Sequence, residues 1–336
     1  MTDKPTIILT GFAGTVGPHI CQKFMQEGYN VIGIDSFLLQ QDVRNFEFAT
    51  SDHFSYVEQD VQTIKPLYII ERLSVQRKLH FLNNVTAVLH FASPASPVWY
   101  RRRPRYTIDS NTVGTINMMS MAKSFNADRF VFASTSEIYG CLNKEEFKEE
   151  DIGMVNSYGN RSCYDVSKMM GETLVKEHGR ETYGLSAGMV RIFNTYSEYG
   201  PKNDGRVISN FVSKALSGQS VEIFGSGKQT RSFMYASDLA EGVFRYTTSN
   251  LEVPINLGNP HEYHSINELA RIVNYLVCSS YGATTQMKIK HVPIDKDDPP
   301  IRRPNIDKAI YHLGWEPKVT LKEGLLKVCE AYNNNG

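Results

Sequence analysis

A glycine-rich turn near the N-terminus places the strongest constraint on the fold of this chain. Residues 11–17 read Gly-Phe-Ala-Gly-Thr-Val-Gly, between an apolar run at 6–10 and a helical pattern at 19–26. Glycines in such a turn let a pyrophosphate approach the backbone N–H groups at the start of the helix. The pattern therefore predicts a strand, a phosphate-binding turn and a helix, although a merely structural tight turn is the alternative.

An acidic residue follows at the spacing expected for a ribose contact. The next apolar run ends at Asp35, where a carboxylate holds the hydroxyls of an adenosine ribose and repels a 2′-phosphate, so NAD is favoured over NADP. Asp60 and Val61 follow the third predicted strand and are candidates for the adenine, with Asp60 equally suited to an ordinary loop. The cofactor residues predicted here are Gly11, Phe12, Ala13, Gly14, Thr15, Val16, Gly17, Asp35, Asp60 and Val61.

Strands and helices alternate as far as residue 194. Apolar runs at 54–56, 87–91, 130–133 and 187–193 predict further strands, and the helical patterns between them include 112–125 and 166–183. This alternation is typical of a doubly wound parallel sheet of the Rossmann type in an α/β fold. Short strands at 221–224, 255–257 and 287–291 then mix with helices and loops.

The chain is therefore predicted to have two parts. We expect a NAD-binding Rossmann domain at 1–195, with a returning segment near 232–250, and a smaller α/β domain at 196–336 that mainly binds substrate.

Composition excludes several other classes of protein. Lys plus Arg and Asp plus Glu both number 36, so a protein built mainly to bind nucleic acid is not expected. The five cysteines lack a CxxC spacing, which indicates reduced thiols rather than disulfides and no metal site. No apolar run reaches about 18 residues and the N-terminus has no signal-peptide pattern, so a cytoplasmic protein with no membrane contact is expected.

Tyr164 and Lys168 indicate redox chemistry on a hydroxyl group. Residues four apart on a helix share one face, where a lysine ammonium lowers the pKa of a phenol. A phenolate beside a nicotinamide can take the proton of a hydroxyl while its carbon gives up hydride. The alternative is a core tyrosine on an amphipathic helix. Residues 134–137, Ser-Thr-Ser-Glu, end the preceding predicted strand.

These three segments together resemble the extended short-chain dehydrogenase/reductase family of nucleotide-sugar epimerases and dehydratases. The resemblance runs from residue 7 to residue 332, and several phrases are similar to those of the UDP-glucuronate decarboxylases in that family. The phrases are at 90–97, 133–140, 191–195, 203–211, 225–231 and 313–317. The resemblance implies bound NAD, a UDP-sugar substrate, and a homodimer formed through the helices at 112–125 and 166–183.

Ser136 and Glu137 distinguish the reactions that the resemblance allows. A 4,6-dehydratase carries an aspartate as general acid at the place of Ser136, and a serine hydroxyl is too weak an acid for that task. A 4-epimerase needs no carboxylate at the place of Glu137. The resemblance therefore implies oxidation at C4, loss of CO2 from a β-keto acid, and release of UDP-xylose. A dehydratase, a 4-epimerase and a non-catalytic NAD- or nucleotide-sugar-binding module are the alternatives.

The resemblance also implies individual roles. Thr135 would bond near the C4 oxygen, Glu137 would position the sugar or a water, and Arg231 would stabilise an enolate unless it is a surface cation. The catalytic candidates are Thr135, Ser136, Glu137, Tyr164, Lys168 and Arg231; the substrate candidates are Tyr100, Asn194, Arg206, Asn210, Arg231 and Arg302; and the further cofactor candidates are Phe91, Ser93, Tyr164 and Lys168. The chain departs from the decarboxylase pattern at Asp109, where those enzymes carry a lysine, and at 196–199.

Overall fold

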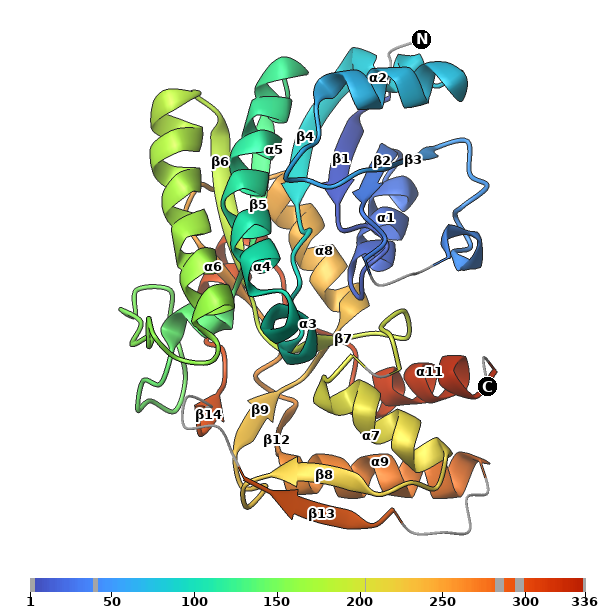
Figure 1. The fold of residues 1–336 in the computed structure, drawn as a ribbon, viewed down its shortest axis with the longest axis vertical. Coiled ribbons are helices and arrows are strands. Elements are labelled where there is room, and N and C mark those ends of the chain that lie inside the picture. The colour runs from blue at the N-terminus through green and yellow to red at the C-terminus, as the bar shows by residue number, and fades with distance from the viewer. Residues whose placement is uncertain (1–3, 39–41, 203, 282–286, 294–298, 335–336) are drawn as a thin grey trace.

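The fold has a large α/β/α part and a smaller part below it (Figure 1). The computed structural model describes residues 4–38, 42–202, 204–281, 287–293 and 299–334. The strands of the large sheet are β1 (Thr6–Thr10), β2 (Asn30–Asp35), β3 (Phe54–Glu58), β4 (Val85–His90), β5 (Arg129–Thr135), β6 (Ser186–Ile192) and β11 (Ile255–Leu257).

The large sheet is parallel throughout. Its seven strands run in the order β11-β6-β5-β4-β1-β2-β3. This is the Rossmann order with β11 added at one edge, so the predicted fold class is confirmed. The chain reverses direction across the sheet between β1 and β4, and the carboxyl ends of the strands at such a switch point are where α/β proteins bind ligands.

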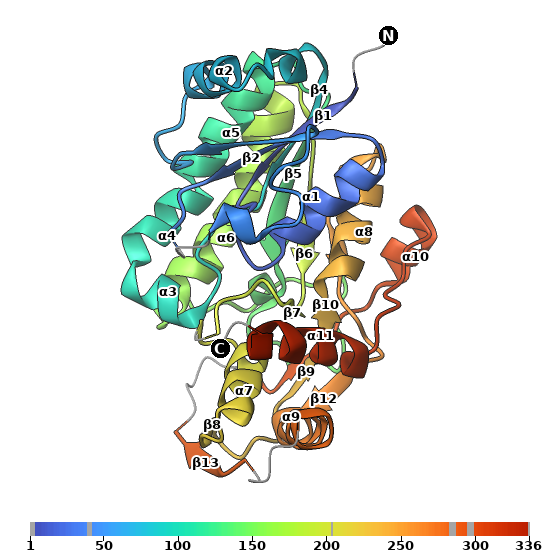
Figure 2. The ribbon, with the colours of Figure 1, turned by 90° about the vertical axis from the view of Figure 1, so that its right-hand side faces the viewer.

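Helices cover both faces of this sheet (Figure 2). On one face lie α1 (Gly17–Gln26) and α8 (Ala236–Thr247), and on the other lie α2 (Pro66–Val75), α4 (Pro104–Asn111), α5 (Val113–Ser124) and α6 (Ser162–Leu174). Side chains of β1 alternate between the two cores, with Ile7 and Leu9 on the α1 side and Ile8 on the other. Burial on both faces explains why the strands appear in the sequence as continuous apolar runs.

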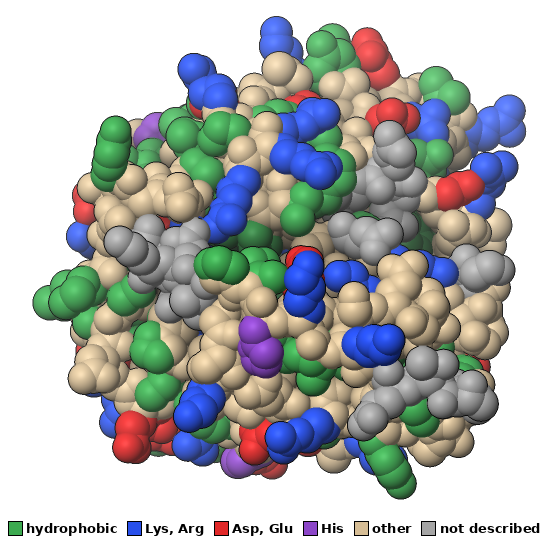
Figure 3. All heavy atoms as spheres, turned by 60° about the horizontal axis from the view of Figure 1, so that its bottom comes forward, with side chains coloured by type: hydrophobic (Ala, Val, Ile, Leu, Met, Phe, Trp, Pro, Cys, Tyr) green, Lys and Arg blue, Asp and Glu red, His purple; other side chains and the backbone are tan. Residues whose placement is uncertain are grey.

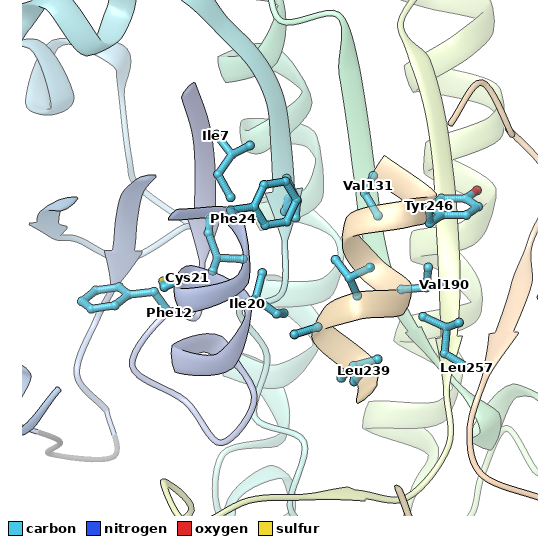
Figure 4. Packing of buried hydrophobic residues seen from close by; sticks show 14 of the residues in the cluster. Ile7, Phe12, Ile20, Cys21, Phe24, Val131, Val190, Leu239, Tyr246 and Leu257 are labelled. Carbon is cyan, nitrogen blue, oxygen red and sulfur yellow. The ribbon is translucent and has the colours of Figure 1, made fainter. Parts of the chain in front are cut away.

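The core on the α1 side is the one seen in Figure 4. There Ile20 and Phe24 of α1, Leu239 of α8 and Val131 and Val190 of the central strands pack together, all without exposed surface. Since α8 lies far from α1 in the sequence, this packing returns a late segment of the chain to the first sheet.

The remaining elements form a connecting region and the smaller part. They are α3 (Pro97–Arg102), β7 (Thr195–Tyr196), α7 (Val207–Leu216), β8 (Val221–Phe224), β9 (Thr230–Ser232), β10 (Met234–Tyr235), β12 (Tyr263–Ser265), α9 (Ile266–Tyr281), β13 (Ile289–Val292), β14 (Ile301–Arg302), α10 (Asp307–Leu313) and α11 (Leu321–Asn334). In the smaller part α7, α9 and α11 share one apolar core.

Most predicted elements are found within a few residues of their expected bounds. The predicted helix at 166–183 is α6 followed by a π-helix at Val175–Thr182. The predicted strand at 255–257, which we grouped with the C-terminal part, pairs instead with β6 in the large sheet. Its three residues are fully buried there, and nothing local in the sequence indicates which sheet a short apolar strand joins.

Candidate active site

A cavity of about 1380 Å³ lies at the carboxyl ends of the central strands. Its wall combines the ends of β5 and β6 with residues of α3, α6, α7 and β9, so both parts of the molecule contribute to it. A smaller pocket of about 150 Å³ beside the glycine-rich turn shares Thr15, Val16, Phe91 and Ser93 with the cavity. The two spaces therefore adjoin one another, as the sites of a cofactor and a substrate that react with one another must.

The glycine-rich turn has the geometry of a phosphate cradle. Gly11 has a positive φ of 74°, and a Cβ there would lie 2.9 Å from the backbone nitrogen of Ala92. A Cβ on Gly17 would lie 2.3 Å from the carbonyl oxygen of Phe12, so only glycine allows α1 to start this close to the turn. Ser93 Oγ, on the wall shared by both spaces, is buried without a hydrogen-bond partner among the described residues.

Asp35 ends β2 and lines the smaller pocket. Its carboxylate accepts hydrogen bonds from the backbone N–H groups of Ala13, at 3.1 Å, and Phe37, at 2.9 Å. Burial raises the pKa of Asp35, and these bonds oppose the rise. The turn, the acid and the orphaned Ser93 hydroxyl together fit a dinucleotide.

Only some of the other predicted cofactor residues line the smaller pocket. Ala13, Gly14 and Val61 line the smaller pocket, whereas Phe12 and Asp60 do not. The Phe12 ring packs into the core against Phe37 and Phe54, which leaves only its backbone at the turn. The Asp60 carboxylate accepts the backbone N–H of Gln62 at 2.9 Å within its own loop. A contact of Asp60 with the adenine stays a prediction.

Tyr164 and Lys168 share one face of α6 and both line the cavity, as predicted from their spacing. Lys168 Nζ donates to the carbonyl oxygen of Ala133 at 2.7 Å and lies 5.8 Å from the centre of the Tyr164 ring. The Thr135 hydroxyl hydrogen-bonds the Tyr164 phenol. The ring of Tyr100 stacks on that of Tyr164 with centroids 5.3 Å apart.

The pKa of Tyr164 is not lowered as the sequence predicted. Burial raises it to about 12, opposed by the Thr135 hydrogen bond and the charge of Arg206. Burial also lowers the pKa of Lys168 to about 7, and the carboxylate of Glu172 opposes that change. The helical spacing alone did not include the effect of burial. Burial disfavours both the phenolate of Tyr164 and the ammonium of Lys168.

Glu137 is held between arginines. Its Oε2 atom lies 2.6 Å from Arg161 Nη2 and 3.0 Å from Arg302 Nη2. Burial would raise the pKa of Glu137, but the charges of Arg161, Arg302 and Arg231 outweigh it and lower the pKa to about 2. Glu137 is therefore a carboxylate at neutral pH, which can accept hydrogen bonds but cannot serve as a proton donor.

Arg302 was predicted to contact substrate, and the structure places it behind Glu137. Its side chain is 1% exposed and is not among the described residues that line the cavity. Arg302 Nη1 donates to the carbonyl oxygens of Ser136, at 2.9 Å, and Gly140, at 3.2 Å. These bonds fix the 3-10 turn that carries Glu137 (Ser136–Tyr139).

The remaining substrate candidates line the cavity: they are Tyr100, Asn194, Arg206, Asn210 and Arg231. Arg206 also lines the smaller pocket, and its Nη1 atom donates to Thr15 Oγ1 at 2.7 Å. Seven Arg and Lys side chains and two carboxylates stand among the described lining residues, an excess that suits an anionic ligand. Figure 3 shows several Lys and Arg side chains near the middle of one face, where carboxylates are scarce.

Two features of the site escaped the sequence reasoning. Arg161 is the N-cap residue of α6 and stands three residues before Tyr164, a spacing that could have suggested it. Behind the site, Glu172 of α6 accepts from Ser134 Oγ at 2.5 Å and from Arg191 Nε and Nη2 at 2.9 and 2.8 Å. This buried network fixes the end of β5 against α6, and no sequence signal pairs these residues.

Residues 196–199, where the sequence differs from the decarboxylase pattern, form a contact between the two parts of the molecule. Ser197 Oγ donates to the carbonyl oxygen of Thr15 in the glycine-rich turn. Glu198 Oε2 pairs with His19 Nε2 of α1 at 3.1 Å and accepts from the Tyr235 hydroxyl at 2.6 Å. Asp109, the other departure, forms an ion pair with Arg105 on α4 and does not line the cavity.

The fold and site define a nucleotide-dependent enzyme scaffold, and the comparisons identify its family. The model of the NAD dependent epimerase/dehydratase family matches residues 7–258, and the chain belongs to that family. It is 40% identical over 332 residues to UDP-glucuronic acid decarboxylase 1 of Danio rerio, covering 98% of this chain and 73% of the relative. It is 38% identical over 328 residues to UDP-glucuronic acid decarboxylase 1 of Arabidopsis thaliana, covering 98% and 70%.

Solved structures of epimerases share the fold. A UDP-glucose 4-epimerase of Thermotoga maritima with UDP-glucose has a TM-score of 0.80 at 25% identity, covering 98% of this chain and 99% of that one. A UDP-glucuronic acid 4-epimerase of Bacillus cereus, in complex with UDP-glucuronic acid and NAD, has a TM-score of 0.82 at 21% identity, covering 98% and 100%. NAD is the cofactor of the family to which the chain belongs.

The described residues contain neither a membrane-spanning helix nor a cluster of metal ligands. No helix there combines the length and the apolar character that crossing a membrane requires. No three His, Cys, Asp or Glu side chains in that part of the chain come together as metal ligands.

Proposed function

We propose that the protein decarboxylates UDP-glucuronate to UDP-xylose, as a carboxy-lyase that uses bound NAD. The observation that carries the proposal is the Ser136–Glu137 pair beside Tyr164, with Glu137 held as a carboxylate by Arg161 and Arg302. The relatives named UDP-glucuronic acid decarboxylase, matched over nearly the whole chain, support it.

The first step is oxidation at C4 of the sugar. When bound, NAD supplies the hydride acceptor for this step and the hydride donor for the last one. Tyr164, as the phenolate, takes the proton of the C4 hydroxyl. The hydrogen bond from Thr135 and the charge of Arg206 favour that phenolate against the cost of burial. Gly11, Asp35 and Ser93 stand where the dinucleotide would be held.

The second step is loss of CO2. With C4 as a ketone, the C5–C6 bond breaks, its electron pair moves towards the C4 oxygen, and an enolate forms. Arg231 lines the cavity, and its charge acts on Glu137, so it is suited to stabilise that negative charge. A proton from water then adds to C5, and hydride returns to C4 while Tyr164 returns its proton to the oxygen.

Glu137 has a defined part in this scheme. With a pKa of about 2 it is ionised, so it orients the sugar or a water through hydrogen bonds and does not itself protonate C5. A dehydratase would need an acid at Ser136 for the departing C6 hydroxyl, and the serine cannot supply one. The decarboxylase therefore accounts for both residues better than dehydration does.

Incubation with NAD and UDP-glucuronate, with mass spectrometry for UDP-xylose, tests the proposal. We expect UDP-xylose and one CO2 per substrate, and we expect Tyr164→Phe to lower the rate by roughly 10²- to 10⁴-fold because it removes the proton acceptor. UDP-glucose and dTDP-glucose serve as controls. A 4-keto-6-deoxy sugar formed from either hexose without CO2 release would contradict the proposal in favour of a dehydratase, and binding without turnover would favour a non-catalytic module.

We also propose that the protein is a homodimer and that it acts in a cytosol-like compartment. The helices expected to form the dimer, α5 and α6, carry exposed apolar side chains: Val113 and Ile116 of α5, and Val166, Met169 and Met170 of α6. Ile108 of α4, the helix that precedes α5, is also exposed. Such a cluster is typical of a surface that a second copy covers. We propose the division predicted from the sequence for the two parts, 1–195 with a returning segment near 232–250 for NAD and 196–336 for substrate.

A further inference from the structure

Three successive residues at the end of β5 each hydrogen-bond one residue of α6. The pairs are Ala133 with Lys168, Ser134 with Glu172, and Thr135 with Tyr164. On α6 the three partners are spaced four residues apart, so they share one face of the helix. Tyr164 and Lys168 line the cavity, whereas Glu172 is not among the described residues that do so. Glu172 therefore belongs to the same joint as the reacting residues without reaching the substrate space.

The carboxylate of Glu172 is also held from β6. It accepts from Arg191 Nε at 2.9 Å and from Arg191 Nη2 at 2.8 Å, the two-bond pairing that a guanidinium group makes with a carboxylate. The two side chains are 14% and 10% exposed. Arg191 lies opposite Ser134 in the sheet, so the ion pair joins β6, the end of β5 and α6 at one point.

The same guanidinium group reaches the turn that carries Glu137. Arg191 Nη1 donates to the Tyr139 hydroxyl at 3.1 Å and to the carbonyl oxygen of Glu149 at 2.8 Å. Tyr139 is the last residue of that 3-10 turn. Through Arg191, the position of α6 is therefore coupled to the position of the turn.

Four titratable or charged groups stand around the Lys168 ammonium. They are Tyr164 and Glu172 on α6, His90 at the end of β4, and Arg191 on β6 behind Glu172. Burial lowers the pKa of His90 to about 3, and the charge of Lys168 adds to this effect, so His90 is neutral near pH 7. Burial lowers the pKa of Lys168 to about 7, and Glu172 opposes that change. Glu172 is thus the negative charge that favours the ammonium.

We propose that Glu172, fixed by Arg191, is a positioning residue that holds the end of β5 against α6 and keeps the Lys168 side chain charged. The inference rests on the proposed decarboxylation, in which Tyr164 acts at C4 as the phenolate. A neighbouring ammonium favours a phenolate, which a neutral amine does not. Arg191 has two opposed effects, because it fixes the Glu172 carboxylate and also offsets its charge.

NMR of the protein with lysine isotope-labelled at Cε reports the proton on Lys168 without turnover and without NAD. The Lys168 signal is identified by its loss in Lys168→Arg, and its shift is followed as the pH is raised. Glu172→Gln removes the negative charge and leaves Arg191 in place, so the titration midpoint should fall by about half a pH unit or more. Arg191→Gln leaves the carboxylate without its partner, so the midpoint should rise by a similar amount.

The opposite directions separate this role from a purely structural one. Both variants break the same buried ion pair and should lose comparable stability, so a structural role predicts the same effect from each. Glu181→Gln is the matched control, with the same change at an exposed residue of the π-helix that follows α6. It should leave the midpoint unchanged.

Steady-state kinetics provide the second measurement, with a variant that keeps the ion pair. Ser134→Ala removes the bond between β5 and Glu172 and changes no charge, so it tests the joint even if neither charge variant folds. We expect kcat to fall by about tenfold with KM for UDP-glucuronate nearly unchanged, because the end of β5 carries groups that act at C4.

Midpoints that shift in the same direction in Glu172→Gln and Arg191→Gln, no shift in either, or an equal shift in Glu181→Gln would overturn the inference. An unchanged kcat in Ser134→Ala would also overturn it. Absence of UDP-xylose production by the unaltered protein would instead overturn the proposed function, while the Lys168 titration still reports on Glu172.

Discussion

At the scale of single residues, the charge of Glu137 depends on neighbours that lie far from it in the sequence. Arg161 and Arg302 bond to the same carboxylate oxygen, and Arg302 also bonds to the carbonyl oxygen of Ser136. A charge enclosed in this way depends on its partners, since removing one member leaves the others buried without compensation. The cluster that we propose orients the substrate therefore also stabilises the fold.

Glu137→Gln removes the negative charge and preserves the shape of the side chain. We expect product formation to fall by at least about tenfold, NAD binding to persist, and the free energy of unfolding to drop by about 3 kcal/mol, because the charge that pairs with Arg161 and Arg302 is removed. Urea denaturation, calorimetry with NAD and the product assay measure these effects. Glu145→Gln, an exposed carboxylate on the loop that follows, is the control and should behave as the unaltered protein.

The difference in stability between the Glu137→Gln and unaltered proteins should depend on pH, because the pKa of Glu137 is lowered. A carboxyl whose pKa is about 2 in the folded protein and 4.5 when unperturbed stabilises the fold fully above pH 4.5. That contribution is lost as the pH falls from 4.5 towards 2. The unfolding midpoints of the Glu137→Gln and unaltered proteins should thus differ by a constant amount between pH 6 and 8 and converge below pH 4.5. If the two unfolding midpoints moved further apart as the pH falls, Glu137 would not be held as a carboxylate.

At the scale of elements, β1, the glycine-rich turn and α1 form one unit whose function depends on close backbone approach. Gly11 N donates to the carbonyl oxygen of Ile34 at 2.8 Å, which joins the turn to β2 beside Asp35. Thr10 Oγ1 accepts from the backbone N–H groups of Phe91 and Ala92, both at 3.0 Å. The turn is therefore held against the loop after β4 with no room for a side chain.

Gly11→Ala should push the glycine-rich turn away from the loop that follows β4. Its new Cβ would meet the Ala92 backbone at 2.9 Å, so we expect NAD affinity to fall by at least about tenfold, with roughly 1–3 kcal/mol of strain from the positive φ. Gly28→Ala is the matched control because Gly28 also has a positive φ, 88°, but no atom within 4 Å. The control should lose similar stability and keep its NAD affinity, both measurable by thermal denaturation with and without NAD; equal affinity losses in both variants would contradict the steric argument.

At the scale of the whole molecule, the site exists because the chain crosses between its two parts. Thr15 receives a hydrogen bond from Ser197 at its carbonyl oxygen and another from Arg206 at its hydroxyl. The strand β11 then returns the chain to the edge of the large sheet beside β6. The residues that we propose bind NAD and substrate thereby line two adjoining spaces, and a reaction between cofactor and sugar requires them to be adjacent.

The apolar side chains of α4, α5 and α6 give a prediction for the assembly. Met170 is 49% exposed on the proposed dimer face, so Met170→Glu should place a charge in that interface and shift the protein towards monomer in sedimentation velocity. Val75→Glu, at a residue 79% exposed at the end of α2, is the control and should leave the distribution unchanged. A protein that sediments as a monomer without any substitution would refute the dimer.

Much of the architecture could be predicted because its signals are local. The turn at 11–17, the acid Asp35 and the Tyr164–Lys168 spacing depend on backbone geometry within a few residues, so their pattern is visible in the chain. The position of β11 and the pairing of Ser134 and Arg191 with Glu172 could not be predicted, since they depend on which distant segments pack together.

The sequence by itself determined the Rossmann fold class, the glycine-rich cradle and the residue types available for chemistry at C4. Only the tertiary structure decided the charge states of these residues and which other residues lie beside them. It enclosed Tyr164 and Lys168 so that burial opposes both of their charged forms, and it placed Arg302 behind Glu137 and Arg101 and Arg102 on the cavity wall. The physical reason is that periodicity and turn geometry act over a few neighbouring residues, whereas desolvation and Coulomb interactions depend on every group that the fold brings near.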